Sequence, residues 1–142
     1  MPLIVAEPPA AYAERPRLVV DASVLVSALF GEAECDTALS WMRGRRLCAP
    51  HLIDCEVAHV ALAKVRRGGV DAHAALESVR MLSRSELERC AVDPVDVFAL
   101  ASRTRLSAYD AAYLSLALRL GAPLATFDAR LGAAATQELR DR

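Results

Sequence analysis

Short runs of aliphatic and β-branched residues alternate along this chain with longer segments of helical periodicity. The runs read as strands at residues 17–20, 47–49, 88–92 and 124–126. The helical patterns cover 22–30, 35–43, 52–67 and 71–83, then a helix that begins at Asp93-Pro94, then 109–120 and 129–139. Alternation of this kind is typical of a parallel sheet whose two faces are covered by helices. The sequence therefore predicts an α/β fold, arranged as a three-layer sandwich.

The length of 142 residues fits a single domain, and we expect it to span residues 17–142. Residues 1–16 include Pro8 and Pro9 and lack the basic start of a secretory signal, so we expect a flexible N-terminal extension. No apolar run reaches the roughly 18 residues that a membrane span needs. The four cysteines lack the spacing of a metal site, which favours free thiols in the cytoplasm.

The formal net charge of −1 leaves no global basic field that could attract a nucleic acid. Any such site must come from local clusters, and arginines gather at 43–46 and at 66–67. The plainer interpretation is that these are solvated helix ends, whose charge the helix dipole favours. They are also the best candidates for contacts with phosphate groups.

Four carboxylates lie at or near the ends of the predicted elements. Asp21 directly follows the first strand and Asp128 follows the last, while Asp110 opens the most apolar helix. Glu56 lies inside the long helix, among apolar neighbours. Ligands of open α/β sheets bind beyond the carboxyl ends of the strands, where Asp21 and Asp128 are expected.

Each aspartate also has a purely structural explanation. Asp21 and Asp128 are suited to cap the helices that follow them, and Ser107 with Asp110 forms a plausible capping box. Glu56 has no such explanation. Asp54, two residues before Glu56, points about 200° away around the helix, and we interpret it as a solvated or capping residue. Taken together, the four positions favour a functional cluster.

The contexts of these acids resemble the signature of the PIN-domain family. The matching segments are VVDAS, APHLIDCEVAHVAL, YDAAYLSLA and TFD, which cover residues 18–131. Within that family the chain looks most like the VapC ribonuclease toxins of bacterial type II toxin–antitoxin systems. Many relatives carry Asn where His59 stands, and residues 8–16 have no counterpart.

The resemblance implies a sheet in the order 3-2-1-4-5 and an acidic pocket that holds Mg²⁺ or Mn²⁺. It further implies hydrolysis of RNA phosphodiester bonds, a homodimer and a cognate antitoxin protein. Oxygen ligands select these hard cations over zinc. Asp21, Asp110 and Asp128 are the expected metal ligands, and Ser23 and Thr126 are expected to support them.

Several alternatives stay open at this stage. Glu56 could bind the metal through water or accept a proton from the attacking water, and the number of metal ions and the role of His59 are undecided. A phosphatase of the haloacid-dehalogenase type would need a second Asp where Ser23 stands. A non-catalytic PIN-like module that binds RNA or protein, and a PIN nuclease of RNA processing, remain as rival functions.

Overall fold

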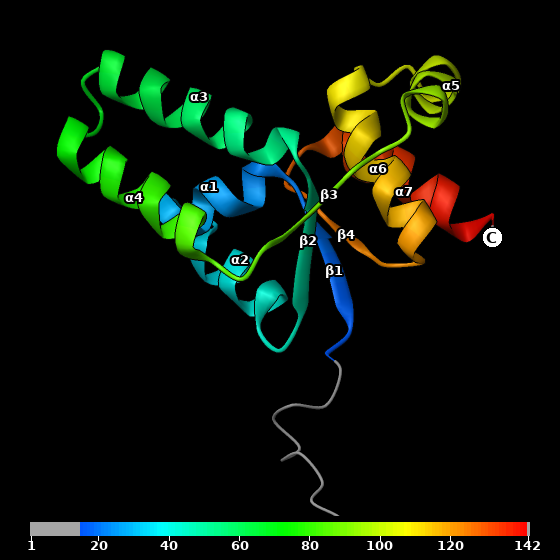
Figure 1. The fold of residues 1–142 in the computed structure, drawn as a ribbon, viewed down its shortest axis with the longest axis horizontal. Coiled ribbons are helices and arrows are strands. Elements are labelled where there is room, and N and C mark those ends of the chain that lie inside the picture. Colours follow the sequence, from blue (N-terminus) through cyan, green and yellow to red (C-terminus); the bar gives the residue numbers. More distant parts are fainter. Residues whose placement is uncertain (1–14, 142) are drawn as a thin grey trace, which may run out of the picture.

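The computed structural model describes residues 15–141, which form one four-stranded parallel sheet with helices on both sides (Figure 1). The strands are β1 (Arg17–Val20), β2 (Arg46–Pro50), β3 (Glu88–Cys90) and β4 (Leu124–Ala125). The helices are α1 (Ala22–Phe30), α2 (Cys35–Met42), α3 (Leu52–Arg66), α4 (Ala72–Arg84), α5 (Pro94–Thr104), α6 (Ala108–Leu120) and α7 (Ala129–Arg140). The predicted elements are thus confirmed within a few residues.

The strand order is β3-β2-β1-β4, and all three neighbouring pairs are parallel. This confirms the predicted order except for its fifth strand, which the described residues do not contain. Helices α1 to α4 lie on one side of the sheet and α5 to α7 on the other (Figure 1). The predicted three-layer sandwich is therefore present.

The core forms where β1 and α6 meet. Val19 and Val20 are fully buried, because β1 lies between β2 and β4 with helices on both faces. In α6, Tyr113, Leu114 and Leu116 are at most 1% exposed, and burial of each such side chain stabilises the fold by roughly 1.5–3 kcal/mol. Helix α6 is thus the central helix of one layer. The prediction that it is the most apolar helix was wrong, because α1, with the sequence ASVLVSALF, is more apolar.

Two helices expose residues that the periodicity assigned to buried faces. The spacing of apolar residues in the sequence predicts that Leu76 faces inward from α4 and that Leu39 shares an apolar face of α2, yet each is 47% exposed. Helix α4 packs mainly on α3 and α1, and α2 mainly on α1, so neither needs a second apolar stripe to cover the sheet. No helix between Arg15 and Asp141 is long and apolar enough to cross a membrane. The predicted N-terminal extension falls, apart from residues 15 and 16, outside the described residues.

Candidate functional site

The acidic residues meet at the carboxyl ends of β1 and β4. These strands are neighbours, and the backbone N–H of Asp21 donates to the carbonyl of Ala125 at 3.3 Å. Asp21 then caps α1, and three residues after Ala125 Asp128 caps α7. The two strands are parallel, and an Asp follows each of them directly or after a short loop. Both carboxylates therefore lie at the same edge of the sheet, as predicted.

Asp21 is buried, at 5% exposure, and both of its carboxylate oxygens accept hydrogen bonds. Oδ1 accepts from the Ser23 hydroxyl at 2.6 Å and from the backbone N–H of Val24 at 3.1 Å. Oδ2 accepts from the Thr126 hydroxyl. The carboxylate is thereby fixed in one orientation by residues of both strand ends.

Ser23 and Thr126 also join the two strand ends to each other. The Ser23 hydroxyl accepts from the backbone N–H of Phe127, and the Thr126 hydroxyl accepts from that of Asp128, both at 2.9 Å. Each hydroxyl therefore donates to Asp21 while it accepts from the β4–α7 loop. The two residues predicted to support the site lie in direct contact with its most buried acid.

The capping interpretation of the aspartates is correct, and it does not compete with the functional one. Asp128 Oδ1 accepts from the N–H of Leu131 at 2.8 Å, and the Ser107 hydroxyl accepts from the N–H of Asp110 at 3.0 Å. An N-cap carboxylate uses only part of its accepting capacity. Both Asp21 and Asp128 can cap a helix and still offer lone pairs to a cation.

Glu56 and Asp110 reach the same place from helices on opposite sides of the sheet. Glu56 is half-buried in α3, and its Oε1 is buried with no hydrogen-bond partner among the described residues. The hydroxyl of Tyr113, one turn after Asp110 on α6, is likewise buried and unpartnered. It faces Glu56 closely enough to lower the pKa of that carboxyl as a hydrogen-bond donor would, although the two groups do not reach ordinary hydrogen-bond geometry. Glu56 Oε1 therefore keeps lone pairs that a ligand could use.

Burial and mutual repulsion raise the pKa of three of the acids. For Asp21, burial raises the pKa most, and the charge of Asp128 adds to it. For Glu56, burial is again the largest cause of the raised pKa. Tyr113 opposes it by lowering the pKa, and the charges of Asp110 and Asp21 raise the pKa further. For Asp110, burial is followed by the charges of Asp128 and Asp21. Asp128 and Asp21 therefore act on Asp110 through space, and Asp110 and Asp21 act on Glu56, which joins all four predicted acids in one cluster.

The donor chemistry fits a hard divalent cation, because every candidate ligand is a carboxylate oxygen. Arg130 offsets part of the negative charge at Asp110, but the pKa of that carboxyl is still raised. The positions are not those of a finished metal site: within residues 15–141, no three His, Cys, Asp or Glu side chains are arranged to hold an ion as they stand. The acids would have to come closer together to share one ion. The four-acid cluster thus supplies the ligands but leaves the coordination shell open.

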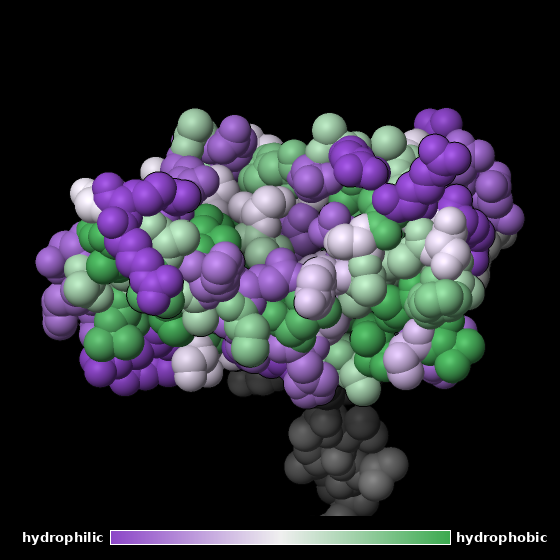
Figure 2. Space-filling model, turned by 90° about the horizontal axis from the view of Figure 1, so that it is seen from above, coloured by the Kyte–Doolittle hydropathy of each residue, from purple (hydrophilic) through white to green (hydrophobic). Residues whose placement is uncertain are grey.

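The cluster lies at the carboxyl ends of the strands, which is the side of the molecule seen from above in Figure 2. On this face, hydrophilic residues lie across the middle among hydrophobic ones (Figure 2). A cavity of about 250 Å³ is lined there by Leu52, Cys55, Glu56, His59, Val60 and Tyr109. His59 thus lies beside Glu56, as the helix spacing predicts. Both are open to a molecule that enters this cavity.

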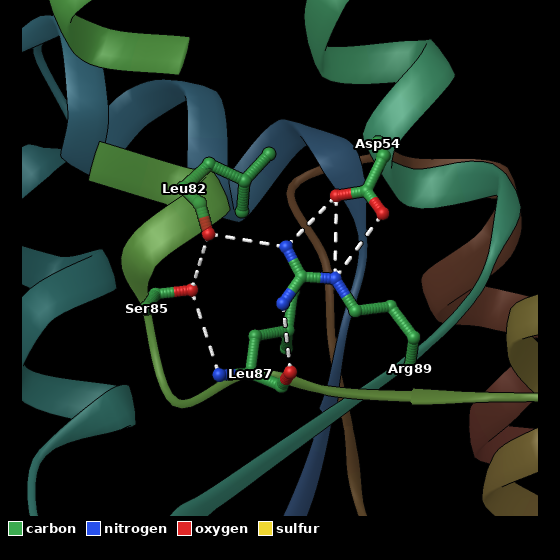
Figure 3. Close-up of polar contacts among 5 residues, drawn as sticks. All are labelled: Asp54, Leu82, Ser85, Leu87 and Arg89. Carbon is green, nitrogen blue, oxygen red and sulfur yellow. Dashed lines mark hydrogen bonds and ion pairs between the residues drawn. The ribbon is translucent and has the colours of Figure 1, made fainter. Parts of the chain in front are cut away.

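Asp54, in contrast, belongs to the framework of the fold. Its carboxylate binds Arg89 of β3 through two guanidinium nitrogens, at 2.9 Å to Nη2 and 3.2 Å to Nε (Figure 3). Arg89 also donates to the carbonyls of Leu82 and Leu87. Asp54 is exposed, as the prediction of a solvated residue implies, and it binds Arg89 rather than the acidic cluster. The ion pair itself was not foreseen, because it depends on the position of β3 beside α3.

Sequence reasoning missed Tyr113 and the aromatic pair of Trp41 and Phe127, whose rings stack with centroids 5.0 Å apart. Tyr113 lies three residues after Asp110 in the YDAAYLSLA segment, so the spacing was available as a signal. The pairing of Trp41 with Phe127 joins α2 to the loop after β4, across 86 residues of sequence, and no local pattern announces it.

Comparison with known proteins gives a consistent result. The family model described as PIN domain matches residues 18–137. Ribonuclease VapC9 of Mycobacterium tuberculosis is 35% identical over 117 residues, which are 80% of this chain and 87% of that protein. Ribonuclease VapC1 of the same species is 32% identical over 120 residues, 82% of this chain and 89% of that protein.

Two solved structures share the fold. The crystal structure of PAE2754 from Pyrobaculum aerophilum superposes with a TM-score of 0.69 at 26% identity, and covers 89% of this chain and 94% of that one. That of Mycobacterium tuberculosis VapC20, described as a sarcin-ricin loop cleaving toxin, superposes with a TM-score of 0.60 at 17% identity, over 82% and 94%.

Proposed function

This chain belongs to the PIN-domain family, among proteins named VapC ribonucleases, and we propose that it is a metal-dependent endoribonuclease that acts as a toxin. Asp21, Asp110 and Asp128 hold Mg²⁺ or Mn²⁺, and Glu56 completes the site. The observation that carries this proposal is the convergence of four carboxylates from separate elements, where burial and the neighbouring carboxylates raise the pKa of Asp21, Glu56 and Asp110. A fold tolerates such repulsion where a ligand relieves it.

The cation supplies Lewis-acid stabilisation of the charge that develops on the phosphate and eases deprotonation of the attacking water. The chain's own residues supply position and proton transfer. Asp21 is held rigidly by Ser23 and Thr126, so it fixes where the scissile phosphate is bound. Glu56 accepts the proton of the attacking water, for which a raised pKa is an advantage near neutral pH.

The proposed substrate is single-stranded or looped RNA, whose bases can be splayed out and read. A toxin of this type needs a cognate antitoxin, and we propose that a protein partner of that kind controls the site. The protein would then act in the cytoplasm, where its four cysteines, which form no disulfide here, stay reduced.

We also propose a homodimer, formed through α3 and α4. Leu62 on α3 and Leu76 and Met81 on α4 are 46–63% exposed, and these helices pack against each other as one layer. Large apolar side chains that gather on one layer indicate a protein-contact surface.

The decisive experiment compares cleavage of total cellular RNA by wild type, Asp21→Asn and Asp110→Asn, each with Mg²⁺ and with chelator. We expect discrete fragments from the wild type alone, and only with metal. Asp71→Asn is the matched control, because Asp71 caps α4 in the same way but stands outside the cluster; it should cut like wild type.

Equal cutting by all variants would contradict the proposal. Binding without cutting by every variant, wild type included, would identify the chain as a non-catalytic RNA-binding module instead. Cleavage confined to one precursor RNA, at a maturation site, would favour a nuclease of RNA processing over a toxin.

A further inference from the structure

A second cavity opens beside the four-acid cluster, on the outer edge of the sheet next to β4. It has a volume of about 600 Å³ and is lined by Leu18, Ser40, Trp41, Arg43, Arg45, Pro123, Leu124, Ala125, Thr126, Gly132, Ala135, Thr136 and Leu139. Volumes of about 300–1,000 Å³ are typical of small-molecule sites. None of the predicted acids lines this cavity, so it is separate from the cluster.

Trp41 gives the cavity an aromatic wall. One face of its indole stacks on Phe127, and the side chain remains 39% exposed. Phe127 is in turn fixed by the bond from its N–H to the Ser23 hydroxyl. The indole is therefore held in place from behind, which is the arrangement that favours stacking of a planar ligand on its free face.

The rim of the cavity is basic. Arg43 and Arg45 follow Trp41 within four residues and line the same cavity, and neither has an ion-pair or hydrogen-bond partner for its side chain among residues 15–141. Other arginines of the described chain are taken up by acids, such as Arg46 by Glu88 and Arg103 by Glu138. The two free guanidinium groups suit the phosphates on either side of a stacked base.

Thr126 connects the cavity to the cluster. Its hydroxyl donates to Asp21, while its side chain forms part of the cavity wall, where its methyl carbon lies beside Gly132. If one phosphate of an RNA strand lies at the acids, the neighbouring nucleotide can therefore enter this cavity.

We propose that this cavity is a nucleotide subsite, in which one unpaired base of the RNA stacks on Trp41 while Arg43 and Arg45 contact the flanking phosphates. The subsite rests on the proposed ribonuclease function, and it adds a residue that positions the RNA strand relative to the acidic cluster. Stacking of a base on an aromatic side chain is general in single-strand recognition and accepts any base. Trp41 is accordingly a positioning residue for the substrate.

Trp41 is the only tryptophan of the chain, so its fluorescence reports on the cavity directly. We would titrate the full chain, in chelator to prevent cleavage, with a short single-stranded RNA, the same RNA made abasic, and inorganic polyphosphate. Quenching by the first ligand alone is expected. Phe98→Ala, which removes an exposed aromatic of α5 instead, should quench as wild type does.

If all three ligands quenched the fluorescence of Trp41 equally, or if none did, the proposal would be overturned. An emission that acrylamide does not quench in the free protein would also overturn it, because the cavity would then already be filled by protein. Since no cleavage is required, quenching by bases in a protein that never cuts RNA would refute the ribonuclease while it upholds the subsite.

Kinetics give the second test. Trp41→Ala should raise KM for single-stranded RNA by about 5- to 150-fold, the range that stacking of one base covers, with kcat nearly unchanged; Trp41→Phe should recover most of the loss. Arg45→Gln should weaken binding and flatten its salt dependence, whereas Arg84→Gln, an exposed arginine outside the cavity, should not. A loss confined to kcat, or a melting temperature that falls in parallel with activity, would assign Trp41 a structural role only.

Discussion

The two halves of the acidic cluster are built differently. On the sheet side, Asp21 is almost fully buried and takes hydrogen bonds from Ser23, Val24 and Thr126. On the helix side, Glu56 is half-buried with an unpartnered oxygen, next to the unpartnered hydroxyl of Tyr113. One half is organised before anything binds, and the other has interactions still to make.

This difference suggests a division of labour. A carboxylate fixed by three donors keeps its position when a ligand arrives, so it suits the task of holding a cation. A carboxylate with a free oxygen and a raised pKa can gain a proton and release it, so it suits acid–base work. The predictions below test whether the two halves do separate in this way.

The largest effect should come from Asp21→Asn. The variant removes the anchored charge, so cleavage should fall by at least about a thousandfold, and Mg²⁺ should no longer raise the melting temperature, as it should for wild type. Glu56→Gln should lower kcat by about 10²–10⁴-fold but retain most of the Mg²⁺ effect on melting. The test is to measure the cleavage rate and the Mg²⁺ effect on the melting temperature for both variants. If both variants lose both properties equally, the two halves of the cluster act as one unit.

A smaller effect is expected from the residues that orient Asp21. Thr126→Val keeps the shape of the side chain and removes the hydroxyl that donates to Oδ2. The apparent affinity for Mg²⁺ or Mn²⁺ should fall by about 10- to 100-fold, as is usual when a ligand loses its orienting partner. Thermal titration with either ion measures it. Asp71→Ala is the comparison outside the cluster: it removes the cap of α4, costs about 0.5–2 kcal/mol of stability, and should leave metal affinity close to that of wild type.

The sequence was sufficient for the framework because local signals and global fold agree in this chain. Asp21 and Asp128 are caps that also follow strands, and parallel pairing of β1 with β4 brings any two such residues together. Glu56 could be singled out since a charge in mid-helix among apolar residues has no local purpose. For Asp21, Asp128 and Glu56, the place of each residue in its helix or strand was therefore enough to predict where it lies in the fold.

What escaped prediction depends on contacts between distant segments. The ion pair of Asp54 with Arg89 requires the placement of β3 beside α3, and the stack of Trp41 on Phe127 requires that of α2 beside the last loop. The expected fifth strand is a property of the resemblance; no fifth β-rich run stands in the sequence, and residues 15–141 contain four strands. Spacing along the chain carries no information on such pairs.

A moderate effect on stability should follow from the raised pKa values of Asp21, Glu56 and Asp110. Between the ordinary and the raised pKa of each group, the native state holds protons that the unfolded chain has released. The free energy of unfolding in chelator should therefore fall as pH rises from the ordinary carboxyl pKa through the raised values, and remain at its lower level above them. Asp110→Asn should be more stable than wild type at about pH 8, with a smaller difference at about pH 5, and saturating Mg²⁺ should reverse the order at the higher pH. Denaturant melts at both pH values check this; a wild-type stability that rises with pH in chelator would contradict it.

The smallest effect on stability, but the most specific one, should come from Tyr113→Phe. The Tyr113 hydroxyl is buried without a hydrogen-bond partner among the described residues, so its removal should change the free energy of unfolding by less than about 1 kcal/mol and could raise it. The hydroxyl lowers the pKa of Glu56, so without it that pKa should rise further.

The acid limb of the pH profile of kcat/KM should accordingly move to higher pH in Tyr113→Phe. If Glu56 is the group that titrates, Tyr113→Phe should produce no further shift when Glu56→Gln is already present, since the coupling between the two residues has then been removed. An equal shift in both backgrounds would assign the titration to another acid of the cluster, and the sheet side of the site would then have to supply the proton acceptor as well as hold the cation.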